Sequence, residues 1–226
     1  MKAWLDKLTE TFLTSGYYKL MLEGLGNTVI ITLGALVIGV VIGALIATVK
    51  YLAEDNSALA PAAWLCDAYV KIIRGIPVVV LLLIFYFVIF TSSEGVEVAV
   101  LTFGVNSGAY MAELIRGGIH AVDQGQMEAG RSLGLSRLQT MERIIFPQAL
   151  RHILPAIGNE FIALIKETSV AGYVAVVDVT RAGNLVRNNT YDAVNSLMLV
   201  ALTYLTLVLA LTAVLEQFEK KLNKGR

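Results

Sequence analysis

The chain has 226 residues, of which 56% are hydrophobic and 16% are charged. Soluble domains carry about 25% charged residues, so this composition is too apolar for an ordinary soluble globule. The net charge is +0, which excludes the strongly basic balance typical of nucleic-acid binding. The one cysteine, Cys66, excludes an intrachain disulfide and a multi-thiolate metal site. We therefore expect a membrane protein without a metal centre.

Five segments are predicted to cross a membrane as helices. A spanning helix needs about 20 mostly apolar residues. The third segment is short and polar and can span only with its flanks, while the fourth carries charged side chains. The predicted fold is an all-α membrane protein with five transmembrane helices, at residues 24–49, 75–93, 98–112, 153–177 and 193–215.

The segments outside the spans suggest how the chain is oriented. Residues 1–23 lack the apolar core of a signal peptide, so we expect an interfacial helix there. Placing the N-terminus outside leaves most loop lysines and arginines on the cytoplasmic side, with the C-terminus. The predicted domains are this interfacial helix, a membrane domain at 24–215 with a cytoplasmic loop at 115–152, and a basic cytoplasmic tail at 216–226.

Two local patterns in the first two spans predict how these helices pack and begin. Small residues recur at every fourth position of the first span, which lets another helix approach closely. The second span begins at Arg74, which can stay at the cytoplasmic interface, and Pro77 falls near its first turn, where a missing N–H costs least. The small residues are Ala35, Gly39, Gly43 and Ala47.

The fourth span carries ionisable side chains, which usually face a bundle interior or a wet cavity. Seven residues make almost two helical turns, so Glu160 aligns with Glu167 and Asn159 with Lys166. For Lys166 and Glu167 we favour charge neutralisation or snorkelling over ligand contact. For Asn159 and Glu160, nearer the midplane, we favour lining of a polar pathway. The third span supplies further donors and acceptors, at Asn106, Ser107 and Tyr110.

Residues 115–152 are too polar to insert and too patterned for a slack linker. Asp123 followed by Gln126 resembles a helix N-terminal box, and Gly134 can adopt the left-handed conformation that ends a helix. The loop therefore begins with a short predicted helix that ends at Gly134.

A second short helix is predicted to follow this glycine. It starts at Ser136 with Gln139 and ends at Pro147. Its apolar face packs under the chain's own bundle or docks in a groove on another protein. That face consists of Leu138, Met141, Ile144 and Ile145.

These residues carry a resemblance to a known family. The loop resembles the EAA loop of binding-protein-dependent ABC transporter permeases, whose pattern is E-A-A-x3-G-x9-I-x-L-P. The matching residues are Glu128-Ala129-Gly130, then Gly134, then Ile144-Ile145-Phe146-Pro147. The spacing matches throughout. Gly130 replaces the third alanine, which lowers helix propensity by roughly 1 kcal/mol, and Phe146 replaces leucine.

Flanking segments narrow the resemblance to the polar amino-acid uptake permeases of bacteria, which include the histidine, glutamine and arginine systems. Together they extend the resemblance over nearly the whole chain. The matching segments are 74–77, 106–113, 116–119, 125–126, 147–151, 159–160 and 166–169.

The resemblance implies a MetI-like type I ABC importer fold in a bacterial inner membrane. Two permease subunits, identical or related, would form the pathway for a polar amino acid that an external binding protein delivers. The EAA loop would couple to a cytoplasmic ATPase, which binds ATP and Mg. This chain lacks the G-x4-G-K-[ST] phosphate loop, so we expect neither an enzyme nor a bound cofactor. The residues implied in coupling are Glu128, Ala129, Gly130, Gly134, Ile144 and Pro147.

Two other classes of protein are compatible with an apolar chain. An ion-coupled carrier or channel would use the charged residues of the fourth span as its ion path. The sequence shows no repeated pair of broken hydrophobic segments, and this reading leaves the apolar face of the loop unused. A membrane enzyme has little support, because Cys66, His120 and His152 form no recognisable catalytic set.

Overall fold

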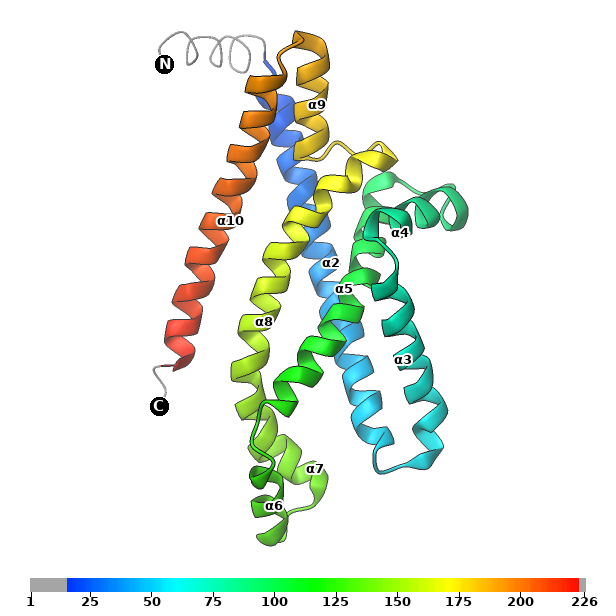
Figure 1. Cartoon of the computed structure of the whole chain (residues 1–226), viewed down its shortest axis with the longest axis vertical. Helices are drawn as coiled ribbons and strands as arrows, with labels where there is room; N and C mark the ends of the chain where they lie inside the picture. The colour runs from blue at the N-terminus through cyan, green and yellow to red at the C-terminus, as the bar shows by residue number, and fades with distance from the viewer. Residues whose placement is uncertain (1–15, 224–226) are drawn as a thin grey trace. The chain divides into compact units, whose positions relative to one another are not determined.

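The structure is a computed structural model that describes residues 16–223 (Figure 1). All regular secondary structure in this part of the chain is helical, which confirms the all-α prediction. The first helix, α2, spans Tyr18–Ala53. Residues 18–23 therefore belong to the first span and not to a separate interfacial helix, because nothing interrupts the helix after Tyr18. The preceding residues of that predicted helix lie outside the described range.

The described residues form two compact units, each built from three stretches of chain. Unit 1 comprises residues 16–36, 76–104 and 163–211. Its largest buried side chain, Phe103, packs with Ile31, Leu82 and Leu164. Besides the first parts of α2 and α5 it holds α4 (Val78–Ile84), the π-helix η3 (Phe85–Ile89), the 3-10 helix η5 (Thr168–Val174), α9 (Val179–Thr190) and most of α10 (Ala193–Asn223).

A buried carboxylate organises the end of unit 1 where α9 begins. Asp178 accepts hydrogen bonds from the backbone N–H groups of Thr180 and Arg181, both at 3.0 Å, and so caps α9. The Tyr204 hydroxyl of α10 donates to the same carboxylate at 3.3 Å. Burial raises the pKa of Asp178, although these hydrogen bonds act in the opposite direction.

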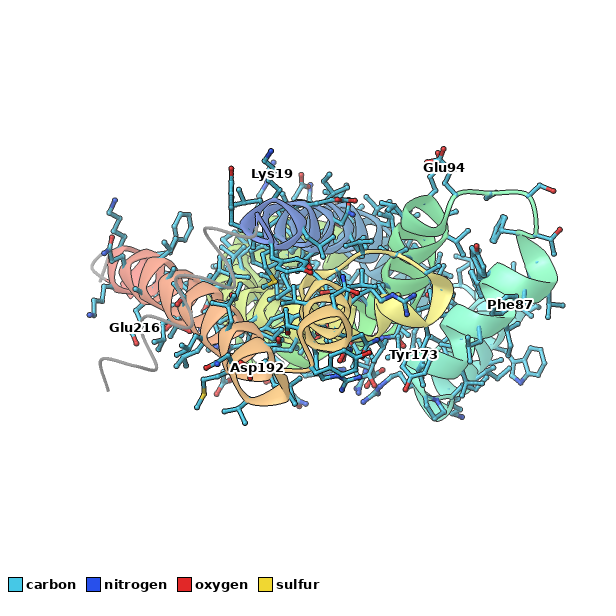
Figure 2. All side chains as sticks on the ribbon, turned by 90° about the horizontal axis from the view of Figure 1, so that it is seen from above. Lys19, Phe87, Glu94, Tyr173, Asp192 and Glu216 are labelled. Carbon is cyan, nitrogen blue, oxygen red and sulfur yellow. The ribbon has the colours of Figure 1, made fainter. Side chains whose placement is uncertain are left out.

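On the outside of the unit, Phe87 and Tyr173 project away from the ribbon (Figure 2).

Unit 2 comprises residues 37–75, 105–162 and 212–223. Its core has two apolar clusters, one around Ile145, Ala149 and Ile153 and one around Ile46 and Val70. Besides the second part of α2 it holds the 3-10 helix η2 (Ser57–Leu59), α3 (Ala60–Gly75), the rest of α5 (Gly95–His120), α6 (Gly125–Ser132), α7 (Arg137–Thr140), the π-helix η4 (Met141–Ile145) and most of α8 (Phe146–Glu167).

Three helices of the described chain are long and apolar enough to cross a membrane, namely α2, α5 and α10. The bent pair Ser57–Gly75 and Val78–Ile89 satisfies the same test when it is counted as one broken span. As expected, the third predicted span becomes long enough only with its flanks, since α5 covers Gly95–His120. The division into a membrane domain and a basic tail stays a prediction, and α10 continues through this boundary to Asn223.

The second predicted span, residues 75–93, is confirmed in its middle and wrong at both ends, since helical structure runs from Val78 through α4 and the π-helix η3 to Ile89. The helix α3 ends at Gly75, and α4 begins only at Val78. Pro77 stands before α4 with an extended ψ of 134°, and a proline also disfavours helical conformation in the residue ahead of it, here Ile76. The apolar residues of this span therefore form the second half of a broken pair.

The boundaries predicted for the fourth span, residues 153–177, are also wrong. The helix α8 begins seven residues earlier, at Phe146, and ends at Glu167, where a 3-10 helix takes over. Its 22 residues could cross about 30 Å of hydrocarbon, but it is not among the helices that pass the test of length and hydropathy. Polar residues such as Arg151, Asn159 and Glu160 lower its hydropathy.

The stripe of small residues on α2 provides close packing, as predicted. In unit 2, a Cβ atom added at Gly39 would lie 2.8 Å from Ser107 Oγ. One added at Gly43 would lie 2.4 Å from Met111 Cβ and 2.8 Å from the backbone nitrogen of Ala112. Real Cβ atoms do not approach other atoms so closely, so both glycines are needed for this contact between α2 and α5.

We expect Gly43→Ala to destabilise the protein by about 1–3 kcal/mol, because the new methyl group would push α2 away from α5. Thermal unfolding of the purified protein in detergent measures the effect. Gly26→Ala is the matched control, since it lies on the same helix with nothing within 4 Å of an added Cβ. Equal stability of the two variants would contradict the packing role of Gly43.

Candidate substrate pathway and coupling hairpin

The structure brings together two of the residues predicted to line a polar pathway. Ser107 of α5 is fully buried, and its hydroxyl donates a hydrogen bond to Glu160 Oε1 of α8 at 3.2 Å. Asn106, beside Ser107, is 3% exposed. Asn159 is exposed, because consecutive residues point about 100° apart around a helix. Ser107 and the half-buried Glu160 therefore lie in contact, with Asn159 away from them, and lining of a pathway by these residues stays a prediction.

Tyr110 lies one helical turn beyond Ser107 and contacts a residue that the sequence did not suggest for this place. The guanidinium of Arg74, at the end of α3, lies over the Tyr110 ring, 5.0 Å from its centroid. Stacking of an arginine on an aromatic face is a favourable cation–π contact. Arg74 therefore lies beside Tyr110 in unit 2, and its place at the cytoplasmic interface stays a prediction.

Glu113 adds a second carboxylate to this face of α5. Arg116 donates to it from Nε at 3.3 Å and from Nη2 at 2.8 Å, a bidentate arrangement. Arg74 Nη1 is 3.9 Å from Glu113 Oε2, at the outer limit of an ion pair. Both Arg74 and Glu113 lie within the segments that carried the family resemblance. Their position in these motifs was the signal from which the sequence could have suggested them as site residues. Lys166 and Glu167 lie instead in the last turn of α8, where Lys166 is exposed.

The loop between α5 and α8 forms the predicted helical hairpin (Figure 1). Gly134 has a φ of +84°, so it takes the left-handed conformation that ends the first short helix, α6. Ser136 and Gln139 form a reciprocal capping box at the start of α7. Both of these predictions are confirmed.

The capping box predicted at the start of the first short helix, α6, is confirmed for Asp123 and wrong for Gln126. Asp123 accepts a hydrogen bond from the backbone N–H of Gly125 at 2.7 Å, which satisfies one free donor of α6. Gln126 does not reach back to Asp123. Its side-chain oxygen accepts instead from Gln148 Nε2 at 3.3 Å, so it connects the hairpin to α8.

Pro147 does not end the second helix, contrary to the sequence prediction. Helical structure runs without a gap from Arg137 through η4 into α8, and Pro147 sits in the first turn of α8. The turn before it is a π-helix in which the N–H of Phe146 bonds to the carbonyl of Met141. A wider π turn accommodates the missing N–H and the ring of a proline, so the chain continues as a helix.

Close packing explains why a glycine, and not the third alanine of the EAA pattern, stands at position 130. Gly130 is buried, and a Cβ atom there would lie 2.4 Å from Thr140 Cγ2 and 2.8 Å from its Oγ1. Thr140 is fully buried in α7. The two short helices of the hairpin therefore touch where Gly130 faces Thr140. Glycine lowers the helix propensity at this position, but it allows the two helices to pack closely.

The hairpin combines a packed side with an open side, so packing under the chain's own bundle is confirmed for part of its apolar residues, while docking on another protein stays a prediction. Ile145 is buried in the core of unit 2, and Met141 and Ile144 are half-buried. Leu133 is 81% exposed and Leu138 is 60% exposed. The predicted coupling residues Glu128 and Ala129 are exposed as well, and so is Pro147.

Arg137 attaches the hairpin to the end of α2. Its Nη1 and Nη2 atoms donate to Asp55 and Glu54, respectively, and its guanidinium lies 4.9 Å from the centroid of the Tyr51 ring. Burial disfavours the charge, but the hydrogen bonds that Arg137 donates to both carboxylates outweigh it and raise the pKa of Arg137. Nothing in the sequence pattern pointed to these partners, which lie 82 and 83 positions away.

An open cavity of about 750 Å³ lies beside this attachment, between α2, α3, α5 and the hairpin. Lys50, Asp67, Arg116 and Arg137 are among its charged lining residues, and Lys50 pairs with Asp67 at 2.6 Å. Within residues 16–223, no group of three or more His, Cys, Asp or Glu side chains could hold a metal ion. Lys50 and Arg137 form ion pairs between different segments of unit 2, and Arg116 pairs with Glu113 within α5.

The fold and the hairpin define a membrane subunit of an ABC importer, and comparison with known proteins agrees. The family model for the binding-protein-dependent transport system inner membrane component matches residues 39–224, and the chain belongs to this family. The arginine transport system permease protein ArtQ of Bacillus subtilis (strain 168) is 35% identical over 209 residues, 91% of this chain and 93% of the relative. The glutamine transport system permease protein GlnP of Escherichia coli (strain K12) is 32% identical over 213 residues, 90% and 93% of the two chains.

Solved structures show the same fold. A chain from the crystal structure of an amino acid ABC transporter with histidines has a TM-score of 0.85 and 35% identity, and the match covers 92% of this chain and 96% of that one. A chain of the inward-facing MetNI methionine ABC transporter has a TM-score of 0.78 at 22% identity, with 91% and 97% covered. The MetI-like fold prediction is thereby confirmed. The chain is a permease subunit and not an enzyme.

The contact between Gly130 and Thr140 yields a test with two opposite outcomes. We expect Gly130→Ala to destabilise the protein by about 1–3 kcal/mol through overpacking, and Gly130→Ala with Thr140→Ala to recover part of the loss. Thermal unfolding in detergent measures both, with Gly117→Ala as the control because it has nothing within 4 Å. If helix propensity dominated, Gly130→Ala alone would instead gain up to roughly 1 kcal/mol.

The attachment by Arg137 is testable with a double-mutant cycle. We expect Arg137→Ala and Asp55→Ala to couple by about 1 kcal/mol or less, because exposed ion pairs are screened by water. Unfolding free energies of the two single variants and the double variant give this coupling. The same cycle between Asp55→Ala and Arg143→Ala, an exposed arginine of η4, should give none. Additive effects in the Arg137 cycle would show that the contact contributes nothing.

Proposed function

We propose that the chain is the transmembrane permease subunit of an ATP-driven ABC importer for polar amino acids. The observation that carries this proposal is the hairpin, whose EAA-type sequence leaves Glu128, Ala129 and Leu138 open at the surface of unit 2. Two relatives that align with about nine tenths of this chain, at 35% and 32% identity, are named for arginine and glutamine transport. The protein would be a multi-pass inner-membrane protein with its N-terminus outside and its C-terminus in the cytoplasm.

The hairpin is the part that would meet a cytoplasmic ATPase. Exposed apolar side chains such as Leu133 and Leu138 suit insertion into a groove of a partner, the helix-in-groove mode of recognition. ATP and Mg would be bound by that partner, which also hydrolyses ATP. Because Gln148 bonds to Gln126 and Arg137 bonds to Asp55, a movement of the hairpin would be passed on to α8 and to the end of α2.

The polar face of α5 and α8 is the part that would handle the solute. The buried Ser107 and the half-buried Glu160 form its centre, with Asn106 beside Ser107 and Tyr110 one turn away. An external binding protein would deliver the amino acid, and a second permease subunit, identical or related, would supply the other half of the pathway. The residues of this face supply the donors and acceptors that a zwitterionic solute needs when it leaves water.

An ion-coupled carrier or channel is not favoured. The relatives are subunits of ABC importers, and a carrier would leave the exposed face of the hairpin without a role. Lys166 is exposed at the end of α8, which fits the expectation that it balances charge or reaches an interface. ATP-independent electrical currents would be the signature of the carrier or channel.

Reconstitution tests this function directly. Proteoliposomes with the permease, its ATPase and its external binding protein should take up amino acids only when ATP is inside. Leu138→Glu should abolish most of the uptake, because the added charge would enter an apolar groove of the ATPase. Gln217→Glu, which adds a charge to an exposed position on the last helix, should transport normally.

Several outcomes would contradict the proposal. ATP-independent uptake, or no uptake of any amino acid with a complete complex, would exclude an amino-acid ABC importer. Normal uptake by Leu138→Glu would remove the coupling role of this face of the hairpin. Copurification of the ATPase with the Leu138→Glu permease, compared with the Gln217→Glu control, separates lost docking from lost folding.

A further inference from the structure

Arg74 lies beside the predicted pathway residues of unit 2, at the broken end of a helix. The helix α3 ends at Gly75, one residue later, and the next helix begins only at Val78. Helices that are interrupted in this way commonly build the solute sites of membrane transporters, because the break frees polar groups within the membrane. The guanidinium of Arg74 is held over the ring of Tyr110 and is therefore positioned on the polar face of α5.

The guanidinium of Arg74 keeps a free hydrogen-bonding edge. Among the described residues, the only carboxylate oxygen within 4.0 Å of it is Glu113 Oε2, at 3.9 Å. Glu113 already accepts two hydrogen bonds from Arg116. Arginine binds carboxylates best through two parallel N–H groups, and no protein carboxylate in the described part of the chain fills that position. Arg74 can therefore receive a carboxylate from outside the chain.

Glu160 offers the opposite charge with one oxygen unused. Its Oε1 atom accepts the hydrogen bond from Ser107, while no hydrogen bond to Oε2 is present within residues 16–223. Glu160 is half-buried, so this carboxylate can be approached. A partly buried carboxylate with a free oxygen is a suitable acceptor for an ammonium group.

The two opposite charges are held at neighbouring turns of α5. Ser107, which holds Glu160, and Tyr110, which holds Arg74, are three residues apart on α5, a rise of about 4.5 Å. Arg74 also attracts the Glu160 carboxylate electrostatically. A free amino acid carries an ammonium and a carboxylate on neighbouring atoms, with the same pair of charges in reverse. Arg74 and Glu160, both held against α5, therefore present charges complementary to those of the amino acid.

We propose that Arg74 and Glu160 together recognise the main-chain groups of a free amino acid, with Arg74 binding the α-carboxylate and Glu160 the α-ammonium. This inference rests on the proposed function and adds a specificity-determining residue, Arg74, to it. Because all amino acids share these two groups, this pair of residues would not by itself select a basic side chain. Side-chain selection is left to the external binding protein and to other residues.

Arginine and its decarboxylated analogue agmatine test the role of Arg74, because they differ only in the α-carboxylate. Direct binding of each to the detergent-solubilised complex of permease and ATPase is measured by isothermal titration, with L-glutamine as a third probe. The wild-type complex should bind L-arginine or L-glutamine, and should bind agmatine more weakly than L-arginine. Arg74→Gln should weaken amino-acid binding by roughly 10–100-fold and should remove the preference for L-arginine over agmatine.

Two further variants keep the test decisive. Arg74→Lys retains the charge but loses the two-pronged geometry, so it should weaken amino-acid binding by roughly ten-fold even if Arg74→Gln fails to assemble. Lys71→Gln removes an exposed cation one turn earlier on α3 and should bind like the wild type. Unchanged affinity in Arg74→Lys, or an unchanged preference over agmatine in Arg74→Gln, would overturn the role of Arg74.

Glu160→Gln examines the other half of the pair. It should weaken binding of both L-arginine and agmatine, because both carry an amino group, whereas Arg74→Gln should weaken only the carboxylate-bearing ligand. Equal losses for all ligands in Arg74→Gln would indicate a purely structural role and overturn the proposal. If the wild-type complex transports no amino acid in proteoliposomes, the proposed function itself fails, which is a different result from normal transport that is insensitive to Arg74.

Discussion

The helices α2 and α5 approach closely in unit 2 because glycines of α2 leave room for side chains of α5, and the contact between Ser107 and Glu160 depends on this approach. Gly39 leaves the space that Ser107 occupies, and Gly43 leaves the space for Met111. With the backbones so close, Ser107 is fully buried and its hydroxyl has Glu160 as its partner. A larger residue at Gly39 would displace Ser107 and, with it, the hydrogen bond that orients the carboxylate. Close packing therefore sets the geometry of the chemistry.

The same reasoning connects the hairpin with the rest of unit 2. Gly130 faces Thr140 inside the hairpin, while Gln126 and Arg137 attach its two short helices to α8 and to the end of α2. No long loop separates the second short helix from α8, because the π turn carries the chain through Pro147. The exposed side of the hairpin is thus presented on a braced support, which suits a part that transmits force between a partner and the membrane helices.

Several features could be predicted because they depend on neighbouring residues only. The all-helical class follows from apolar length, the left-handed Gly134 from its place after a short helix, and the capping box from Ser136 and Gln139. The broken second span shows the limit of such reasoning. Its apolar run is continuous in sequence, but the helical part of it covers only Val78–Ile89, because the chain is not helical at Pro77 between α3 and α4.

By itself, the sequence determined which residues are apolar, where the polar face of the fourth span lies and which short motifs form the hairpin. These are properties of composition and helical periodicity. Only the tertiary structure decided that Ser107 bonds to Glu160, that Arg74 stacks on Tyr110 and that Arg137 reaches Asp55. Each pair joins residues 36 to 82 positions apart. Such contacts depend on the packing distance between helices, which glycines and side-chain volumes set and which no local pattern records.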